Sequence, residues 1–464
     1  MKHTRLFMIL WQAIGPVAMQ VMAQGGTAQQ MQDRAASPRQ PAPLVPHHPV
    51  DLILGRPTST SVVLSVLCDH DAGAVVAYGM QKTDFVDRTE RVSLAKDHPH
   101  EIILEKLKPD TAYFYRLLDG AAEKIMCEGK FHTARTPGST FSFTVTADSH
   151  LDQNTDPALY QRTLANVLAD TPDFHIDLGD TFMAEKHENR GNATRQYLAQ
   201  RFYFGQLAQF APLFLVLGNH DGEERKLLRD GADSLAIWAN TMRKRYFPNP
   251  VPDGFYTGNA ATDPLAGLLQ DYYAWSWGDA LFVVLDPYWH AADQRSDERW
   301  ELSLGNTQYN WLKQTLAASN ARFKFVFIHQ LVGGIDRQGR GGVEAAAFGE
   351  WGGRNADGSE GFQDHRPGWE LPIHQLLVRN QVTAVFHGHD HLFARQELDG
   401  IVYQEVPQPG DPHGNTRNAV EYGYRDGTIF GSSGYMRVTV APDRLRVDYV
   451  RPDRSVAHTY TIKP

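Results

Sequence analysis

Two different patterns of apolar and polar residues divide the chain near residue 137. Between residues 48 and 136, short apolar runs are separated by turn residues at fairly even spacing, and no segment with a helical period interrupts them. This pattern is typical of a small all-β sandwich. The strands that it predicts cover residues 60–67, 74–78, 101–104, 111–118 and 124–133.

After residue 137, apolar β-type runs alternate with amphipathic helical stretches. Such alternation predicts an α/β architecture, here over residues 137–464. The predicted helices cover residues 157–169, 195–210, 232–244, 308–319 and 372–380. Near the end of the chain, three runs with period-two alternation predict strands that close the edge of this domain, at residues 434–440, 445–450 and 458–462.

The first 23 residues have the pattern of an export signal. Lys2 and Arg5 precede an apolar stretch over residues 6–21, which ends in a small-residue cleavage site at Ala23. A membrane anchor is the alternative, but polar residues and a proline interrupt the run. We therefore expect a periplasmic or secreted protein with no stable membrane span after cleavage. Residues 24–47, rich in Gln, Ala and Pro, read as a disordered linker.

Composition and charge narrow the possible partners. The chain has 464 residues, of which 42% are hydrophobic and 21% charged, and its net charge is -9. This acidity argues against a nucleic-acid-binding surface, which would be basic. An anionic substrate would have to be attracted by local charges. Export would permit a disulfide between Cys68 and Cys127, and two buried free thiols are the open alternative.

Polar clusters follow five of the apolar strand-like runs. Because open α/β folds bind ligands where strands end, these clusters predict a site along one rim of a sheet. They are Asp148-Ser149-His150, Gly179-Asp180, Gly218-Asn219-His220-Asp221, His329, and His387-Gly388-His389-Asp390-His391.

The residue types in these clusters indicate metal chemistry. Carboxylate, imidazole and amide oxygen are ligands of ions such as Zn, Mn and Fe, and no cysteine contributes. Seven ligands exceed the needs of one tetrahedral ion but suit two ions that share a carboxylate. Two such metals stabilise the attacking and leaving oxygens in phosphoryl transfer. The candidate ligands are Asp148, His150, Asp180, Asn219, His329, His389 and His391.

The ordered series Asp-x-His, Gly-Asp, Gly-Asn-His-Asp, isolated His and Gly-His-x-His resembles that of the calcineurin-like metallophosphoesterases. The resemblance covers residues 140–455 and implies a β-sandwich flanked by helices. The preceding β-domain resembles the one in purple acid phosphatases, and residues 107–113 resemble the tyrosine corner of fibronectin type III domains.

The resemblance also implies a role for each residue. Asp180 would bridge the two metals, and a metal-bridging hydroxide would be the nucleophile. His220 would contact the phosphoryl group or protonate the leaving oxygen, with Asp221 orienting it. The first metal would be held by Asp148, His150 and His391, and the second by Asn219, His329 and His389. His387, next to the ligands, is expected to be structural, and His175 to be a core residue.

One position departs from the purple acid phosphatases. Those enzymes place a Gly where His150 stands and a Tyr where Met183 stands. The two changes compensate, because His150 would replace the missing tyrosinate as a ligand. The resemblance therefore implies two divalent or trivalent ions (Mn, Fe or Zn) without the tyrosinate-to-iron colour.

The stretch from residue 333 to 368 contains eleven glycines and little periodicity, which predicts a long loop or lid beside the metals. Its Arg337, Arg340, His365 and Arg366 are candidate phosphate-binding residues, and solvated loop charges are the alternative. Residues 183–195 form a second candidate rim loop.

Taken together, the sequence predicts an exported hydrolase of phosphate mono- or diesters. A hydrolase of nucleotides or other phosphorylated metabolites would carry the same motifs. A non-catalytic surface protein is a third possibility, but degenerate relatives would lack ligands, and here the seven ligands and His220 are all present.

Overall fold

Two β-sheets that pack face to face form the centre of the α/β region. The computed structural model describes residues 43–120, 123–229, 231–291, 298–335 and 339–464. One sheet has six strands in the order β11-β10-β9-β22-β23-β24, and the other has eight in the order β12-β15-β16-β17-β18-β20-β19-β21. Phenylalanines from both sheets fill the space between them. The Phe143 ring, for example, meets the Phe282 ring edge-on at 5.1 Å between centroids.

The six-stranded sheet is parallel over β9, β10 and β11 and antiparallel over the rest. Its strands are β9 (Phe141–Thr146), β10 (Phe174–Asp177), β11 (Leu213–Leu215), β22 (Tyr435–Ala441), β23 (Arg444–Val450) and β24 (Val456–Ile462). The last three strands follow β9 and extend to the edge, as predicted from their alternating pattern.

The eight-stranded sheet is parallel over β16, β17, β18 and β20. Its strands are β12 (Thr257–Gly258), β15 (Tyr273–Trp277), β16 (Ala280–Val284), β17 (Phe323–Phe327), β18 (Ala384–His387), β19 (Leu392–Leu398), β20 (Ile401–Glu405) and β21 (Thr428–Gly431). A separate hairpin pairs β13 (Thr262–Asp263) with β14 (Gly267–Leu268).

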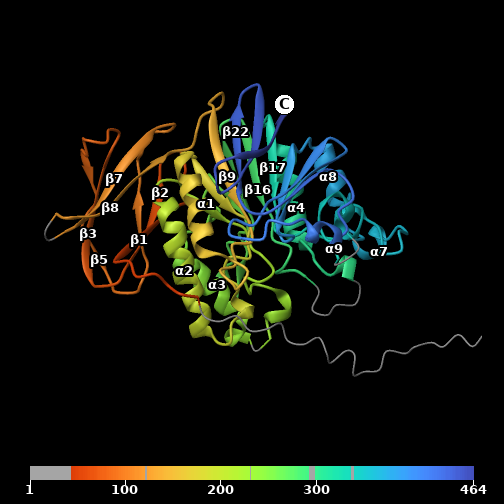
Figure 1. The fold of residues 1–464 in the computed structure, drawn as a ribbon, viewed down its shortest axis with the longest axis horizontal. Helices are drawn as coiled ribbons and strands as arrows, with labels where there is room; N and C mark the ends of the chain where they lie inside the picture. The colour runs from red at the N-terminus through yellow and green to blue at the C-terminus, as the bar shows by residue number, and fades with distance from the viewer. Residues whose placement is uncertain (1–42, 121–122, 230, 292–297, 336–338) are drawn as a thin grey trace, which may run out of the picture. The chain divides into compact units, whose positions relative to one another are not determined.

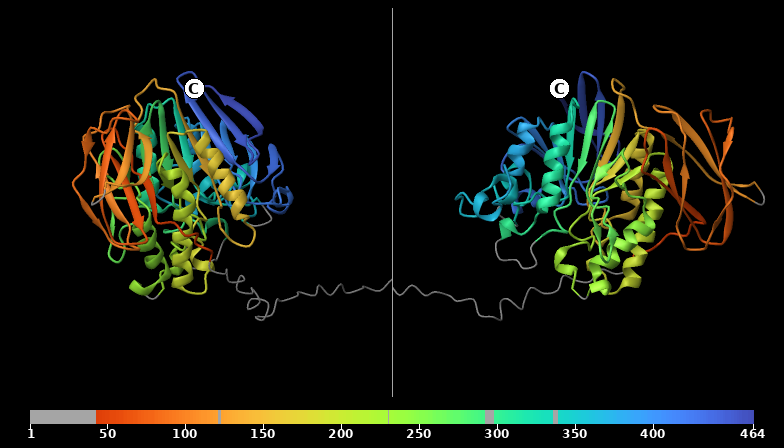
Figure 2. Two further views of the ribbon diagram at one scale, coloured as in Figure 1. Left: turned by 60° about the vertical axis from the view of Figure 1, so that its left-hand side comes forward. Right: turned by 180° about the vertical axis from the view of Figure 1, so that it is seen from behind.

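Helices lie on both sides of the two sheets (Figures 1 and 2). α1 (Pro157–Ala169), α2 (Arg190–Ala208) and α3 (Leu235–Tyr246) lie on one side, and α4 (Gly305–Ala318) and α8 (Ile373–Arg379) on the other. The shorter helices are α5 (Gly342–Ala345), α6 (Gly349–Gly352), α7 (Phe362–His365), α9 (Arg417–Glu421) and the single 3₁₀ turns η1 (Ala184–Lys186), η2 (Arg225–Leu227), η3 (Gly231–Asp233) and η4 (Glu298–Trp300). The observed fold is thus the predicted α/β sandwich flanked by helices.

A small antiparallel β-sandwich precedes the α/β region, as predicted. One sheet has the order β1-β2-β6, and the other has the order β4-β3-β7-β8, with β5 paired to β3. The Tyr113 hydroxyl accepts a hydrogen bond of 2.9 Å from the Lys108 amide, which is the tyrosine-corner contact. The strands are β1 (Val50–Gly55), β2 (Val62–Cys68), β3 (Ala72–Gly79), β4 (Asp87–Arg88), β5 (Val92–Leu94), β6 (His100–Leu104), β7 (Ala112–Asp119) and β8 (Ile125–His132).

The two cysteines are free thiols on different sheets of this sandwich. Cys68 ends β2 and Cys127 lies in β8. Burial raises the pKa of Cys68 to about 11 and that of Cys127 to about 12, so both stay protonated at neutral pH.

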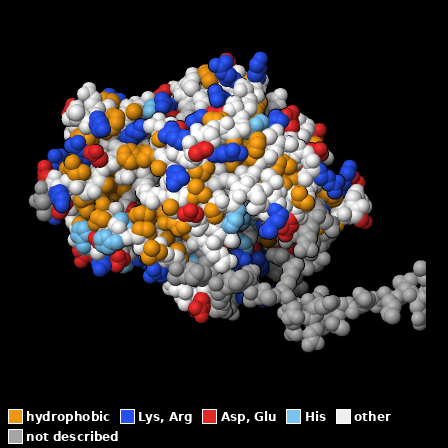
Figure 3. Space-filling model, in the orientation of Figure 1, with side chains coloured by type: hydrophobic (Ala, Val, Ile, Leu, Met, Phe, Trp, Pro, Cys, Tyr) orange, Lys and Arg blue, Asp and Glu red, His pale blue; other side chains and the backbone are white. Residues whose placement is uncertain are grey.

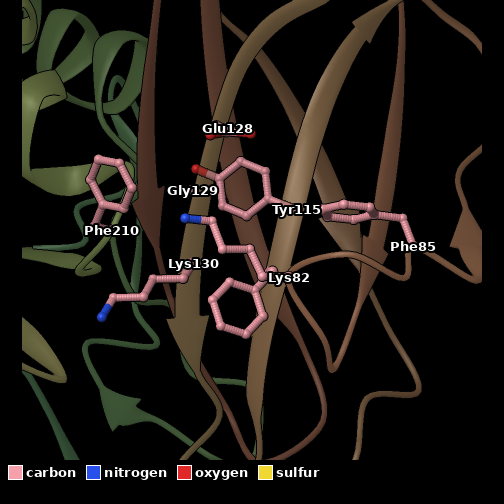
Figure 4. A pocket seen from close by; sticks show the side chains of 8 residues that line it. Lys82, Phe85, Tyr115, Glu128, Gly129, Lys130 and Phe210 are labelled. Carbon is pink, nitrogen blue, oxygen red and sulfur yellow. The ribbon is translucent and has the colours of Figure 1, made fainter.

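A buried arginine and a tyrosine join the β-sandwich to the α/β region. Arg201 of α2 is fully buried; its Nε donates to Asp51 Oδ1 at 2.7 Å and its Nη1 to Ser65 Oγ at 3.0 Å. The Tyr115 hydroxyl donates to the Gln209 carbonyl at 2.8 Å. Beside this contact is a hollow of about 280 Å³ lined by aromatic rings and lysines, with Phe210 on the α/β side (Figure 4).

The glycine-rich stretch that was expected to be a long loop is instead packed structure over its described residues. It contains α5, α6 and α7, and Trp351 of α6 is fully buried. Its glycines permit close backbone contacts. A Cβ at Gly333 would lie 2.2 Å from the Phe348 carbonyl oxygen, and one at Gly349 2.1 Å from that of Arg299. The glycine content therefore reflects tight packing.

The sequence also predicted an N-terminal signal, a linker, no stable membrane span and no basic surface, and the structure describes only part of these regions. The predicted signal and most of the predicted linker lie outside the described residues. Within the described ranges, no helix is long and apolar enough to cross a bilayer. On the face shown in Figure 3, basic and acidic side chains are interspersed.

Candidate metal centre

Two clusters of titratable side chains lie at the ends of the parallel strands. Within each cluster, the potential ligand atoms lie within 4.8 Å of one another. The first cluster is Asp148, His150 and His391, and the second is Asp180, His329 and His389. These are six of the seven residues that the sequence predicted as metal ligands, and the three predicted for the first metal lie in one cluster.

The clusters lie between two sheets, whereas the sequence predicted one rim of a single sheet. Asp148, Asp180 and Asn219 follow β9, β10 and β11 of the six-stranded sheet. His329 follows β17, while His389 and His391 follow β18, both in the eight-stranded sheet. Each cluster therefore combines aspartate from one sheet with histidine from the other.

In the first cluster, one oxygen of Asp148 is fixed and the other faces histidines. Its Oδ2 accepts a hydrogen bond of 2.9 Å from the His389 amide. Its Oδ1 lies 3.4 Å from His391 Nε2 and 3.7 Å from His150 Nε2. Metal–ligand bonds of roughly 2.0–2.2 Å at tetrahedral angles put donor atoms roughly 3.3–3.6 Å apart. The observed spacing is close to that of a coordination shell.

Asp180, a member of the second cluster, is arranged in the same way and also lies close to the first cluster. Its Oδ1 accepts a hydrogen bond of 2.8 Å from the His220 amide. Its Oδ2 lies 3.6 Å from His150 Nε2, in the first cluster, and 3.4 Å from His329 Nε2, in the second. A carboxylate oxygen shared by two ions would need this position.

The second cluster also includes Asn219. Its Oδ1 lies 3.1 Å from His329 Nε2, and His389 Nδ1 lies 3.2 Å from the same nitrogen. His329 Nδ1 donates to the Leu178 carbonyl at 2.8 Å, so in the neutral ring Nε2 carries a lone pair. An amide oxygen and imidazole nitrogens directed at one point form a suitable set of donors for a cation.

Two further observations show that the residues fit a metal. Asp148 Oδ1 and His150 Nε2 are buried without a hydrogen-bond partner among the described residues. Burial would lower the pKa of His329, but the charges of Asp180 and Asp148 outweigh it and raise the pKa to about 9. The pocket therefore stabilises positive charge, as protons or as metal ions that displace them.

The backbone at the candidate ligands is strained. Asp148, His150, Asp180, His389 and His391 all have left-handed φ angles, between 42° and 82°. Such angles are uncommon for residues other than glycine and concentrate at functional sites. The adjacent glycines allow the loops to approach closely, since a Cβ at Gly218 would lie 2.3 Å from Asp180 Oδ1.

His220 lies beside the clusters and is held by a residue that the sequence did not indicate. Its Nδ1 lies 2.6 Å from Oε1 of Glu185, in the 3₁₀ turn η1. Since a carboxylate only accepts, Nδ1 is the donor. Burial would raise the pKa of Glu185, but the hydrogen bond and charge of His220 outweigh it and lower the pKa. The pair is thus an ionic hydrogen bond at the edge of the site.

The prediction that Asp221 orients His220 is wrong. The Asp221 carboxylate is buried and accepts hydrogen bonds from four backbone amides. The Asp221 side chain points into the loop that carries Asp180. Its Oδ1 accepts hydrogen bonds of 2.9 Å from the Thr181 amide and 2.7 Å from the Phe182 amide. Asp221 therefore positions the loop of Asp180, and Glu185 is the partner of His220.

Comparison with known proteins agrees with this geometry. The model of the calcineurin-like phosphoesterase family matches residues 141–393, which include all seven candidate ligands. The chain belongs to the calcineurin-like phosphoesterase family.

Purple acid phosphatase 23 of Arabidopsis thaliana is 23% identical over 339 residues, or 68% of this chain. The chain spans 60% of the length of that curated relative. The fold is similar to a structure of PhoD, with a TM-score of 0.64, 16% identity, and coverage of 89% of this chain and 90% of that one. It is also similar to the structure of purple acid phosphatase PPD1 from yellow lupin (Lupinus luteus). The TM-score is 0.60 and the identity 14%, and the match covers 91% of this chain and 74% of that one.

The predicted substrate-binding residues of this phosphoesterase are mostly engaged elsewhere. Arg366 pairs with the buried Glu350, and the His365 ring stacks on Trp300 at 4.2 Å. The described contacts of these two residues include no candidate ligand. Their expected role in binding phosphate is therefore not supported, because their charge and ring stabilise the packed stretch. Arg337 lies outside the described residues.

Arg340 does reach the metal region, but behind a ligand. Its Nη2 donates to the His389 carbonyl at 3.0 Å, and its Nε lies 2.9 Å from Asp390 Oδ1. The Tyr424 hydroxyl donates to Asp390 Oδ2 at 2.7 Å. Arg340 therefore supports the loop of His389 instead of facing a substrate.

Two further residues adjoin the site without having been predicted to do so. Tyr288 follows β16, and its ring centroid lies 6.3 Å from that of His329. Glu405 ends β20, and its Oε2 lies 2.5 Å from Nδ1 of His387. His387 is fully buried with this partner, which agrees with the structural role expected for it.

Proposed function

We propose that this chain is an exported binuclear-metal phosphoesterase that hydrolyses phosphate mono- or diesters. The position of Asp180 Oδ2, between His150 of one cluster and His329 of the other, is the observation that carries the proposal. Two ions that share a carboxylate are the arrangement used to stabilise a phosphoryl group during displacement.

In this proposal the two clusters hold one ion each. Asp148, His150 and His391 would hold the first, Asn219, His329 and His389 would hold the second, and Asp180 would serve both. When bound, the ions supply a nucleophile at neutral pH by lowering the pKa of water, and they stabilise the charge of the phosphoryl oxygens. The nitrogen and oxygen donor set suits Mn, Fe or Zn.

The chain's own residues then position and protonate the substrate. His220 is partly exposed at the edge of the clusters, with its Nδ1 held by Glu185. This hydrogen bond fixes the ring with Nδ1 as the donor, so that Nε2 is the nitrogen left to donate a proton to the leaving oxygen. Asp221 keeps the Asp180 loop in place through its four amide contacts.

Export belongs to the proposal as well. It is supported by Lys2 and Arg5 before the apolar stretch and by the small residues that end at Ala23. N-terminal sequencing of the mature protein should begin at residue 24. Recovery of the full N-terminus in the cytoplasmic fraction would refute this part of the proposal and leave the phosphoesterase part standing.

The phosphoesterase activity has a direct test. The protein is purified after growth with Mn, Zn or Fe, its metal content is measured, and it is assayed with para-nitrophenyl phosphate and bis-para-nitrophenyl phosphate. We expect about two metals per chain and turnover of at least one ester, without an absorption band in the visible region from tyrosinate bound to iron. Two bound metals with no turnover of either ester would refute the proposal.

A further inference from the structure

The segment that carries the last two candidate ligands, His389 and His391, lies outside the regular strands. β18 ends at His387 and β19 begins at Leu392. His389 and His391 have left-handed φ angles of 82° and 57°, so the backbone between the strands continues neither of them. Other groups must therefore fix its position, because buried backbone groups need hydrogen-bond partners.

Side chains from distant parts of the chain bind the carbonyl groups of this segment. Each of its three residues accepts a hydrogen bond from a different side chain. The pairs, with the donor first, are Arg340 Nη2 with His389 at 3.0 Å, Asn418 Nδ2 with Asp390 at 3.0 Å, and Ser432 Oγ with His391 at 2.8 Å. The position of the two histidines thus depends on residues that are not candidate ligands themselves.

Asp390, between the two histidines, is fully buried and is held on two sides. Its Oδ1 lies 2.9 Å from Arg340 Nε, and its Oδ2 accepts a hydrogen bond of 2.7 Å from the Tyr424 hydroxyl. Its amide donates to Oε1 of the buried Glu405 at 3.0 Å. One neighbour of Asp390 belongs to the first cluster and the other to the second. A shift of Asp390 would therefore move a ligand in each cluster.

The glycine-rich stretch packs directly against the Asp390 carboxylate. A Cβ at Gly341 would lie 2.4 Å from Asp390 Oδ2 and 2.5 Å from the Tyr424 hydroxyl oxygen. Only glycine fits here without moving one of these groups, since interiors are close-packed. The stretch therefore contributes to the centre through Asp390, although none of its described residues is a candidate ligand.

We infer that Asp390 is a positioning residue for both metals. Its carboxylate, fixed by Arg340 and Tyr424, sets the position of His389 in the second cluster and of His391 in the first. Groups that orient a ligand without touching the metal commonly determine how tightly the metal is bound. This inference rests on the proposed function, since it concerns how the chain holds the ions of the same centre.

The test measures metal binding instead of turnover. The metal-free full chain is titrated with Zn²⁺ in a calorimeter, and the visible absorption of the Co²⁺-loaded protein is recorded. Asp390→Asn keeps the size of the side chain but removes its charge, so the dissociation constants of both ions should rise by roughly 10–100-fold. The Co²⁺ bands should also shift, because they report the coordination geometry.

Two substitutions at other carboxylates are the matched controls. Asp152→Asn makes the same change beside a single ligand, since Asp152 Oδ2 lies 3.4 Å from His150 Nδ1, and it should weaken the first ion alone. Glu350→Gln alters a fully buried carboxylate that pairs with Arg366. The described contacts of Glu350 include no candidate ligand, so both dissociation constants should stay at the wild-type value.

A second variant reaches Asp390 without changing any charge. Gly341→Ala places a methyl group against the Asp390 carboxylate and should also raise both dissociation constants. Gly368→Ala makes the same change in the same glycine-rich stretch, where the added methyl meets nothing within 4 Å, and should have no effect. Thermal unfolding of each variant checks that it is folded.

Wild-type affinity for both ions in Asp390→Asn and Gly341→Ala would overturn the inference and leave the phosphoesterase function standing. Weakening of one ion alone in Asp390→Asn would overturn it too, and so would an equal weakening of both ions in Glu350→Gln. If the wild-type chain binds fewer than two ions, the proposed function fails first and the inference fails with it.

Discussion

His220 Nδ1 lies 2.6 Å from Oε1 of Glu185, while Asp221, its neighbour in the sequence, faces four backbone amides. The hydrogen bond fixes the ring, with Nδ1 as the donor to the carboxylate. Glu185→Gln keeps the shape but removes the charge, so we expect kcat to fall by about 10-fold, a fraction of what general acid catalysis contributes. Metal content should stay at the wild-type level, as measured by elemental analysis.

Asp221→Asn makes the same carboxylate-to-amide substitution at the acidic residue that follows His220 in the sequence. It replaces a carboxylate oxygen that holds the Asp180 loop, and we expect reduced metal affinity and a lower midpoint of thermal unfolding. If Glu185→Gln lost metal while Asp221→Asn lost only kcat, the roles assigned to these two residues would have to be exchanged.

His220 and Asp180 should separate proton transfer from metal binding. His220→Ala removes the proposed acid and should lower kcat by roughly 10²–10⁴-fold, with about two metals still bound. Asp180→Asn removes the shared carboxylate charge and should lower metal occupancy as well as kcat. Elemental analysis together with steady-state kinetics distinguishes the two variants. Loss of metal from His220→Ala would contradict the assignment of His220 as a residue that does not bind metal.

Arg201 connects the β-sandwich to α2 and should contribute strongly to stability. Arg201→Met leaves Asp51 buried without its guanidinium partner, which costs about 3–5 kcal/mol for a buried pair. We expect the free energy of unfolding in urea to fall by about that amount. Arg162→Met, on the exposed face of α1, should change it by less than about 0.5 kcal/mol. Equal effects of the two substitutions would show that the buried pair has no special role.

His175 is the buried core histidine expected from the sequence, and it predicts a dependence of stability on pH. Its nitrogens lie 2.8 Å from Thr144 Oγ1 and 2.9 Å from Thr146 Oγ1, and burial lowers its pKa to about 3. In the unfolded chain the pKa is about 6.5. Between these values the unfolded state binds more protons, so stability falls as pH decreases from about 6.5 to about 3 and is unaffected above that window.

His175→Gln removes this contribution. The wild type should lose roughly 4 kcal/mol more than the variant across the window, measured by urea unfolding at a series of pH values. Release of metal at low pH affects both proteins and cancels in the difference. Parallel curves for the two proteins would show that His175 does not titrate on unfolding.

Where local chemistry decided the structure, the sequence predicted it well. Helix α1 matches the predicted residues because Asp156 caps its first turn and Pro157 suits the first position. Helix α2 begins five residues earlier than predicted. Gly191 and Asn192 have weak helix propensity, but the Asn189 side chain accepts a hydrogen bond from the Asn192 amide and starts the helix there. Strand β1 was missed because it directly follows a stretch rich in proline and histidine.

The candidate site was predictable only as far as strand ends determine it. The seven ligand positions each follow a parallel strand, so their order along the chain indicated a shared site. Glu185 lies in a 3₁₀ turn with no periodicity, and only the need of His220 for an acceptor could have pointed to it. Periodicity also does not say which sheet a strand joins, so the division of the ligands between two sheets appeared only in three dimensions.

That division affects how the protein acquires its metals. Asp148 and His391, in one cluster, are 243 residues apart, and β9 reaches its full pairing only with β22, after both. During synthesis, no complete ligand set exists until more than four-fifths of the chain has been made. Closure of so long a loop is slow. Metal loading would therefore come late in maturation, and bound ions would then join two sheets that already pack against each other.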